Sequence, residues 1–130
     1  MTIHDATAIT IGLAHINAWS TRDWETTRAL LAPNVHAVVT TTHPMRTGAD
    51  ITGIDAYMER KIQAAQLIEP GSTQVTSRIG DDRNALMLVT MRIGLGPGGA
   101  MVTLARAILY LLDENQKIVE ERDAYCLLVP

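Results

Sequence analysis

The chain has 130 residues, 47% of them hydrophobic and 19% charged, with a formal net charge of -3 at pH 7. This length suits a single domain over residues 1–130, and this composition is that of a globular protein rather than a disordered one. No apolar run approaches the ~20 residues of a membrane span, and the basic residues are scattered, so neither a membrane nor a nucleic acid is an expected partner. No basic, apolar leader is visible at the start, so we expect a cytoplasmic location.

Apolar residues at helical spacing dominate the first half of the chain. They predict a first helix over residues 5–20, a second, shorter helix over 24–31, and a third from about residue 54 to Pro70. Capping-box spacings place the starts of the first and third helices, with Thr2 before Asp5 and Thr52 before Asp55.

Between the second and third helices, a Val- and Thr-rich run predicts a strand over 35–42, and a loop follows over 43–50. From Ser72 onward the pattern changes to the two-residue period of strands. Short turns then separate four further strand-like runs, over residues 73–79, 85–95, 101–112 and 117–129. Neighbours joined by short turns pair antiparallel, so we expect an α+β fold in which three N-terminal helices cover one face of a curved antiparallel sheet.

One glycine-rich segment matches a nucleotide-binding pattern by its letters alone. Gly94–Gly99 reads G-x-G-x-x-G, but a strand rather than a helix is expected directly after it. We therefore interpret it as a hairpin turn and expect no dinucleotide cofactor. The single cysteine, Cys126, excludes a cysteine-rich zinc site, and no ligand spacing indicates another metal, so no cofactor is expected.

The order of predicted elements resembles a known superfamily. The segments that carry the resemblance are Arg22–Asn34, Thr52–Tyr57 and Gln116–Tyr125. Together they are similar to the SnoaL-like group of the nuclear transport factor 2-like superfamily, over nearly the whole chain. The resemblance implies a cone-shaped fold around a pocket, and that fold hosts enzymes, binding proteins and assembly modules alike.

Two enzyme groups of this superfamily offer partial matches. Limonene-1,2-epoxide hydrolases have an Arg-Asp-aromatic run whose aspartate is catalytic, and Arg122–Tyr125 lies at the corresponding place. Their second acid, two residues after an arginine, would fall on Gly94 after Arg92, so the triad is incomplete. The residues aligned with the base and the oxyanion-hole acid of ketosteroid isomerases are Val39 and Ile108. The sequence therefore lacks the complete set of catalytic residues of either enzyme group.

Strand parity gives a separate argument for a site. Residues two apart share a face, which joins Arg106, Ile108 and Tyr110 on one strand and Glu121, Asp123 and Tyr125 on the last. If both faces line the cone, Asp123 meets Arg92 or Arg106 in an apolar shell. There it is either a general base or one half of a structural ion pair.

We therefore expect a cofactor-free enzyme that isomerises, cyclises or hydrates a hydrophobic polyketide- or terpenoid-like molecule. The catalytic candidates are Asp123, Arg92 and Arg106, and the substrate-binding candidates are Trp19, His36, Tyr57, Ile108, Tyr110 and Tyr125. The alternatives are an epoxide hydrolase with an altered acid and a non-catalytic binding or association module. A second apolar face on the late strands, formed by Ala105, Ala107, Leu109 and Leu111, predicts a homodimer.

Overall fold

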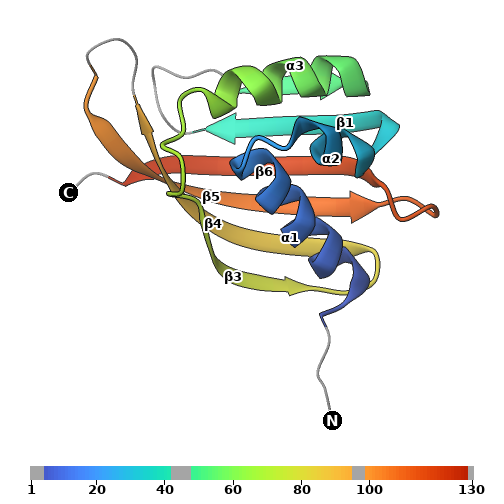
Figure 1. Ribbon diagram of the computed structural model, residues 1–130. Coiled ribbons are helices and arrows are strands. Elements are labelled where there is room, and N and C mark those ends of the chain that lie inside the picture. Colours follow the sequence, from blue (N-terminus) through green and yellow to red (C-terminus); the bar gives the residue numbers. More distant parts are fainter. Residues whose placement is uncertain (1–4, 42–47, 95–98, 129–130) are drawn as a thin grey trace.

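Six strands form one curved sheet, and three helices lie against its concave face, in a computed structural model that describes residues 5–41, 48–94 and 99–128 (Figure 1). The helices are α1 (Thr7–Ser20), α2 (Trp24–Ala29) and α3 (Ile54–Ala65), and the strands are β1 (Leu31–Thr41), β2 (Ala49–Thr52), β3 (Gln74–Gly80), β4 (Asn84–Gly94), β5 (Met101–Leu112) and β6 (Ile118–Leu128). The predicted α+β class is confirmed.

The last strand, β6, lies in the middle of the sheet. The spatial order is β2-β1-β6-β5-β4-β3, and β6 pairs antiparallel with β5 but parallel with β1. In this register Asp123 lies beside Val39 of β1 on one side and Ile108 of β5 on the other. The centre of β6 is therefore flanked by apolar residues in both directions.

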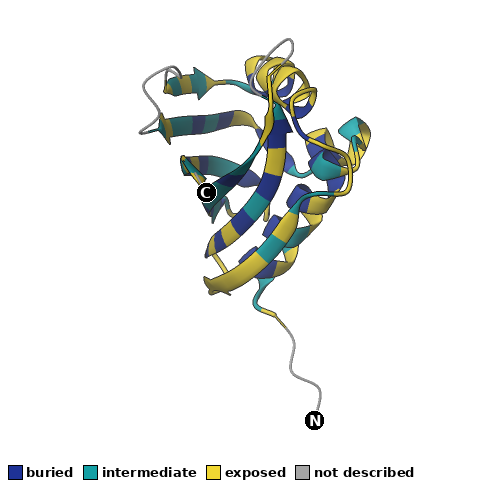
Figure 2. Cartoon of the chain, turned by 90° about the vertical axis from the view of Figure 1, so that its left-hand side faces the viewer, coloured by how far each residue is buried: buried dark blue, intermediate teal, exposed yellow. Residues whose placement is uncertain are grey.

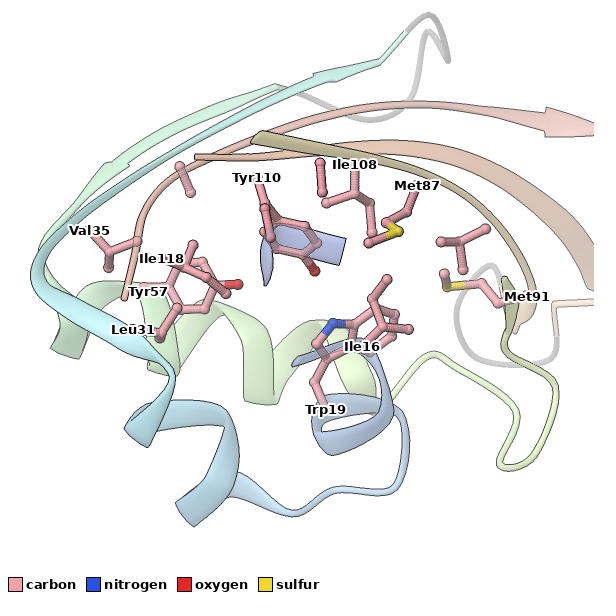
Figure 3. Packing of buried hydrophobic residues seen from close by; sticks show 14 of the residues in the cluster. Ile16, Trp19, Leu31, Val35, Tyr57, Met87, Met91, Ile108, Tyr110 and Ile118 are labelled. Carbon is pink, nitrogen blue, oxygen red and sulfur yellow. The ribbon is translucent and has the colours of Figure 1, made fainter. Parts of the chain in front are cut away.

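The core lies between the helices and the concave face of the sheet (Figures 2 and 3). Along β4, buried and exposed positions alternate, as expected for a sheet with one covered face. Gly12 lets α1 approach closely, because a Cβ atom there would lie 2.7 Å from Cε of Met87 and 2.9 Å from the Tyr110 ring. Helix α1 thus rests directly on β4 and β5.

The structure corrects several predicted boundaries. Residues 49–52, of which 49 and 50 were expected in a loop and Thr52 at a helix cap, form strand β2, and β1 begins at Leu31, where the second helix was expected to end. Pro33 is tolerated inside β1 because the pairing with β6 shifts register between Leu31 and His36, where no ladder hydrogen bond from Pro33 is needed. The parallel pairing of β1 with β6 was not predicted.

The predicted capping boxes are also corrected. Thr2 lies outside the described residues, and the N-cap of α1 is Ala6, without a side-chain hydrogen bond. The N-cap of α3 is Gly53, whose φ of 97° suits glycine, and it too receives no side-chain cap. Asp55, expected to cap, instead accepts a hydrogen bond from Arg28 at 2.7 Å.

The glycine-rich segment is followed by strand β5, as expected for a turn between strands, while residues 95–98 lie outside the described part of the chain. In the described ranges, none of the helices has the length and apolar character that a membrane crossing requires.

Candidate active site

A pocket opens between α3 and the concave face of the sheet. Its volume is about 100 Å³, several times the ~15 Å³ that one buried water needs on the same measure. Most of its wall is apolar, and charged groups gather on one part of it. The lining residues are Ala37, Val39, Ile51, Tyr57, Arg60, Lys61, Ala64, Leu67, Ile68, Met91, Ile93, Leu104, Arg106, Glu121, Asp123 and Tyr125.

Asp123 lies in this pocket and is only 3% exposed. Its Oδ2 accepts a hydrogen bond of 2.5 Å from Arg106, which β5 brings to the same face. Burial raises the pKa of Asp123 to about 7, against the lowering effect of Arg106 and with a further rise from the charge of Glu121. Near neutral pH this carboxyl group therefore exchanges its proton readily.

Glu121 is a second buried carboxyl group, on the same face of β6 and 2% exposed. Its Oε1 accepts a hydrogen bond of 2.5 Å from the Tyr57 hydroxyl, and its Oε2 lies 3.6 Å from Nζ of Lys61. Burial opposes its ionisation, but Lys61, a hydrogen bond with Asp123, Arg106 and Tyr57 together lower its pKa. We therefore assign the negative charge to Glu121 and the exchangeable proton to Asp123, since different surroundings set the two pKa values apart.

His15 connects two tyrosines behind this pair. Its Nδ1 lies 2.9 Å from the Tyr110 hydroxyl and its Nε2 lies 3.2 Å from the Tyr57 hydroxyl. Because Tyr57 donates its proton to Glu121, its oxygen accepts from Nε2, so Nδ1 accepts from Tyr110. Burial holds the pKa of His15 well below 6.5. His15 is therefore a neutral imidazole with its proton on Nε2.

Lys61 enters the pocket from α3. Its side chain is 8% exposed, and Nζ lies 5.0 Å from the ring centroid of Trp19 and 5.3 Å from that of Tyr57. Burial lowers the pKa of Lys61, while Glu121 opposes that effect. The C-terminal end of α3 is held by Arg22, whose guanidinium donates to the carbonyl oxygens of Ala65 and Ile68 at 2.8 Å each.

Four of the predicted site residues come together in the pocket: Asp123, Arg106, Tyr57 and Tyr125. Trp19, Ile108 and Tyr110 are instead completely buried in the core beside it (Figure 3). Tyr110 uses its hydroxyl on His15, and Trp19 packs under Lys61 and Arg106. These three residues support the pocket from behind and do not line it.

The predicted places of Arg92 and His36 in the pocket are wrong, because both residues lie on the outer face of the sheet. Met91 and Ile93 line the pocket, so the intervening Arg92 points away and pairs with Glu69 at 3.3 Å. Ala37 likewise faces inward, so the preceding His36 faces outward, where its Nε2 lies 2.7 Å from Asp50. Strand alternation excludes both side chains from the pocket.

Three functional residues were missed or undervalued in the sequence. Glu121 has the same strand parity as Asp123 and was named only as a neighbour on its face. Lys61 follows Tyr57 by four residues and shares its helix face, but helical spacing alone does not distinguish it from the neighbouring Ile62, which is 37% exposed. His15 lies on α1, far from Tyr57 in the sequence, and only its contacts reveal the link to that residue.

The arrangement provides an acid and base at one place. A carboxyl group with a pKa of about 7 can donate or accept a proton near neutral pH, and Arg106 can stabilise negative charge that develops beside it. Among the residues that the structure describes, no group of three His, Cys, Asp or Glu side chains is placed to hold a metal ion.

Comparisons with known proteins agree with this fold. The SnoaL-like domain matches residues 13–121. The chain belongs to the SnoaL-like family. A search of curated proteins found no match.

Solved structures similar to this SnoaL-like chain share its fold at low sequence identity. One is a Catenulispora acidiphila protein with a ketosteroid isomerase-like fold, 18% identical, covering 87% of this chain and 82% of that one at a TM-score of 0.69. Another is a Burkholderia xenovorans nuclear transport factor 2-like protein, 11% identical, with 92% and 88% covered and a TM-score of 0.71. A third, from Mycobacterium tuberculosis in complex with estradiol-17beta-hemisuccinate, is 12% identical, with 92% and 93% covered and a TM-score of 0.70.

Proposed function

We propose that this SnoaL-like protein is a cofactor-independent enzyme that moves a proton on an apolar small molecule, as in isomerisation, cyclisation or hydration. Asp123 is the acid-base group, and Arg106 stabilises the charge that develops on the substrate. The observation that carries the proposal is a buried carboxyl group with a pKa of about 7 on the wall of a mostly apolar pocket.

The surroundings of Asp123 support this role. Glu121, held ionised by Tyr57 and Lys61, keeps the proton on Asp123 until a substrate competes for it. The Mycobacterium tuberculosis protein with the same fold binds a steroid derivative, which favours an apolar ligand for this pocket too. The cavity also favours an enzyme over an association module, whose cone would be filled by side chains.

Asp123→Asn tests the proposal. We expect the variant to fold and to lose about 100-fold or more in turnover, the usual contribution of general acid-base catalysis. Turnover would be followed on a panel of apolar enones, β-keto esters and epoxides, with proton exchange detected by NMR. Asp55→Asn, which removes an exposed carboxylate of α3, is the control and should keep full turnover. Equal turnover of both variants on every converted substrate would refute the role of Asp123.

A second candidate is epoxide hydrolysis, and one observation favours it. Arg106 lies between two buried carboxyl groups, 2.5 Å from Asp123 and 3.9 Å from Glu121. One carboxyl group can then protonate the epoxide oxygen while the other activates water. Glu121 would supply the second acid that Gly94 does not. Diol formation by the wild type, absent in both Asp123→Asn and Glu121→Gln, would select this reaction within the panel.

We also propose that the outer face of the sheet forms a homodimer interface. Leu86, Leu88 and Leu109 are 38%, 45% and 38% exposed there, side by side on β4 and β5, and Ala107 and Ala124 continue the apolar surface onto β6. A second copy related by twofold symmetry would cover this face.

Light scattering at micromolar concentration should give twice the mass of one chain. Leu88→Glu, which places a charge at the centre of the face, should shift the mass toward one chain. The matched control Ile62→Glu lies on α3, at a similar exposure of 37%, and should leave the mass unchanged. A wild-type mass of one chain at every concentration would overturn the proposed dimer.

A further inference from the structure

The charged part of the pocket has more hydrogen-bond donors than the protein itself uses. Nζ of Lys61 carries three donors, yet among the described residues it makes no hydrogen bond, and its contact with Glu121 is 3.6 Å long. Nε of Arg106 is buried and likewise has no partner there. A buried donor that lacks an acceptor, as Nε of Arg106 does here, costs free energy, and a suitable ligand would remove that cost.

Both cations also share one carboxylate oxygen. Oε2 of Glu121 lies 3.6 Å from Lys61 and 3.9 Å from Arg106, and both separations are too long for hydrogen bonds. The other oxygen, Oε1, is occupied by Tyr57. The carboxylate of Glu121 therefore makes no close hydrogen bond with Lys61 or Arg106 through Oε2, and a second anionic oxygen could accept hydrogen bonds from both cations.

One carboxyl oxygen of the pocket also lacks a partner, but it does not offset the excess of cationic groups around the cavity. Oδ1 of Asp123 is buried without a donor, but its carboxyl group carries a proton that can be shared with Glu121. Arg60 adds another cation to the pocket wall. Positive charges thus outnumber negative ones around the cavity whenever Asp123 is protonated.

We infer that the pocket takes an apolar molecule with one anionic oxygen group, such as a carboxylate, and that Lys61 and Arg106 hold this group. The inference rests on the proposed function only in using the same pocket as the substrate site. It narrows the substrate class from apolar molecules in general to apolar acids, whose hydrocarbon part lies on the aliphatic wall.

Binding of an anion here is coupled to a proton. The titratable groups that face Asp123 are Arg106 and Tyr110 from β5, Glu121 on its own strand, Lys61 and Tyr57 from α3, and His15 from α1. An added negative charge raises the pKa of Asp123 above about 7, so the complex takes up a proton near neutral pH. Affinity for the anion therefore falls as the pH rises through 7.

Three probes with the same hydrocarbon tail and different head groups test the inference: octanoate, octanamide and octylamine. We expect calorimetry at pH 7 to show octanoate binding at least about tenfold tighter than the other two, since hydrogen bonds to a charged group are stronger than those to a neutral group. The apparent enthalpy should change with the ionisation enthalpy of the buffer, as expected for proton uptake. Equal affinities for the three probes would overturn the inference.

Lys61→Met should remove the preference for octanoate and leave the affinity for octanamide unchanged. Lys117→Met, at the only other lysine of the chain and outside the pocket, should keep the preference. Because Lys61→Met can fail to fold, Lys61→Arg is measured beside it and should keep the preference. Retention of the preference in a folded Lys61→Met would contradict the inference, and so would its loss in Lys61→Arg.

The two proposals can fail separately. A clear preference for octanoate with full turnover in Asp123→Asn would remove the proposed catalytic role and support the binding inference. Equal affinities for the three probes, with turnover lost in Asp123→Asn, would overturn the binding inference and support the catalytic role.

Discussion

Glu121→Gln is expected to lower the free energy of unfolding by about 3 kcal/mol, the usual cost of breaking a buried charge pair by neutralising one partner. The change leaves the ammonium of Lys61 in a site that is 8% exposed, without its nearest countercharge. Tyr57 keeps an acceptor, because the glutamine amide oxygen can replace Oε1. Urea denaturation monitored by circular dichroism would measure the difference.

Glu120→Gln is the matched control for this prediction. Glu120 is the preceding residue on β6, faces the other way, and pairs with Arg122 at 2.8 Å on the surface. Exposed pairs of this kind contribute less than about 1 kcal/mol, so its loss should be small. Equal costs for the two variants would show that Glu121 is not an essential countercharge.

The second large effect concerns the pH dependence of stability in two variants. In the folded state the pKa of Asp123 is raised from its ordinary value of 3.8 to about 7, so between these values the folded protein holds a proton that the unfolded chain has lost. Stability therefore falls by about 1.4 kcal/mol per pH unit as the pH rises through this window. The pKa of His15 is lowered, so below pH ~6.5 the unfolded chain binds a proton that the folded state does not, and stability rises with pH.

These two contributions have opposite signs, so below pH ~6.5 they oppose each other in the wild type. Each variant should reveal the contribution of the other group. Asp123→Asn should gain stability as the pH rises toward ~6.5, because the contribution of His15 is then no longer opposed by that of Asp123. His15→Gln, whose amide can still donate to Tyr57, should lose about 1.4 kcal/mol of stability per pH unit up to pH ~7.

Thermal unfolding of both variants in buffers from pH 4.5 to 7.5 would measure these slopes. Asp55→Asn, on the surface of α3, should keep the pH profile of the wild type. Slopes of the same sign in Asp123→Asn and His15→Gln would contradict the assignment of the proton to Asp123 and of the neutral state to His15.

Sequence periodicity predicted the helices and the late strands well, because each depends on residues close in the chain. It also predicted the inward face of β5 and β6, where Arg106 and Asp123 meet. It failed at β2 and at the parallel pairing of β1 with β6, because the ladder between Val39 and Asp123 joins segments that are 84 positions apart. No local pattern encodes such a pairing.

Strand alternation predicted the site residues that lie on β5 and β6, but not those that come from helices. Alternation placed Asp123 in the pocket, but the same rule, applied with Met91 as an inward residue, would have placed Arg92 outside. Lys61 and His15 come from helices, and their distance to Glu121 depends on how those helices dock on the sheet. The charge pattern of the pocket is therefore a tertiary property.

The central position of β6 has a consequence for how this protein reaches its native state. Until β6 inserts, β1 with β2 and β5 with β4 and β3 are two separate ribbons, each with an unpaired edge that faces the other. Closure of the sheet requires contacts between residues far apart in sequence, which slows folding, and open edges favour association between chains. Since β6 also carries Glu121 and Asp123, the strand that completes the sheet introduces both acids of the pocket at the same moment. Intermediates in which β6 is not yet paired should therefore be prone to aggregation and lack both acids of the pocket.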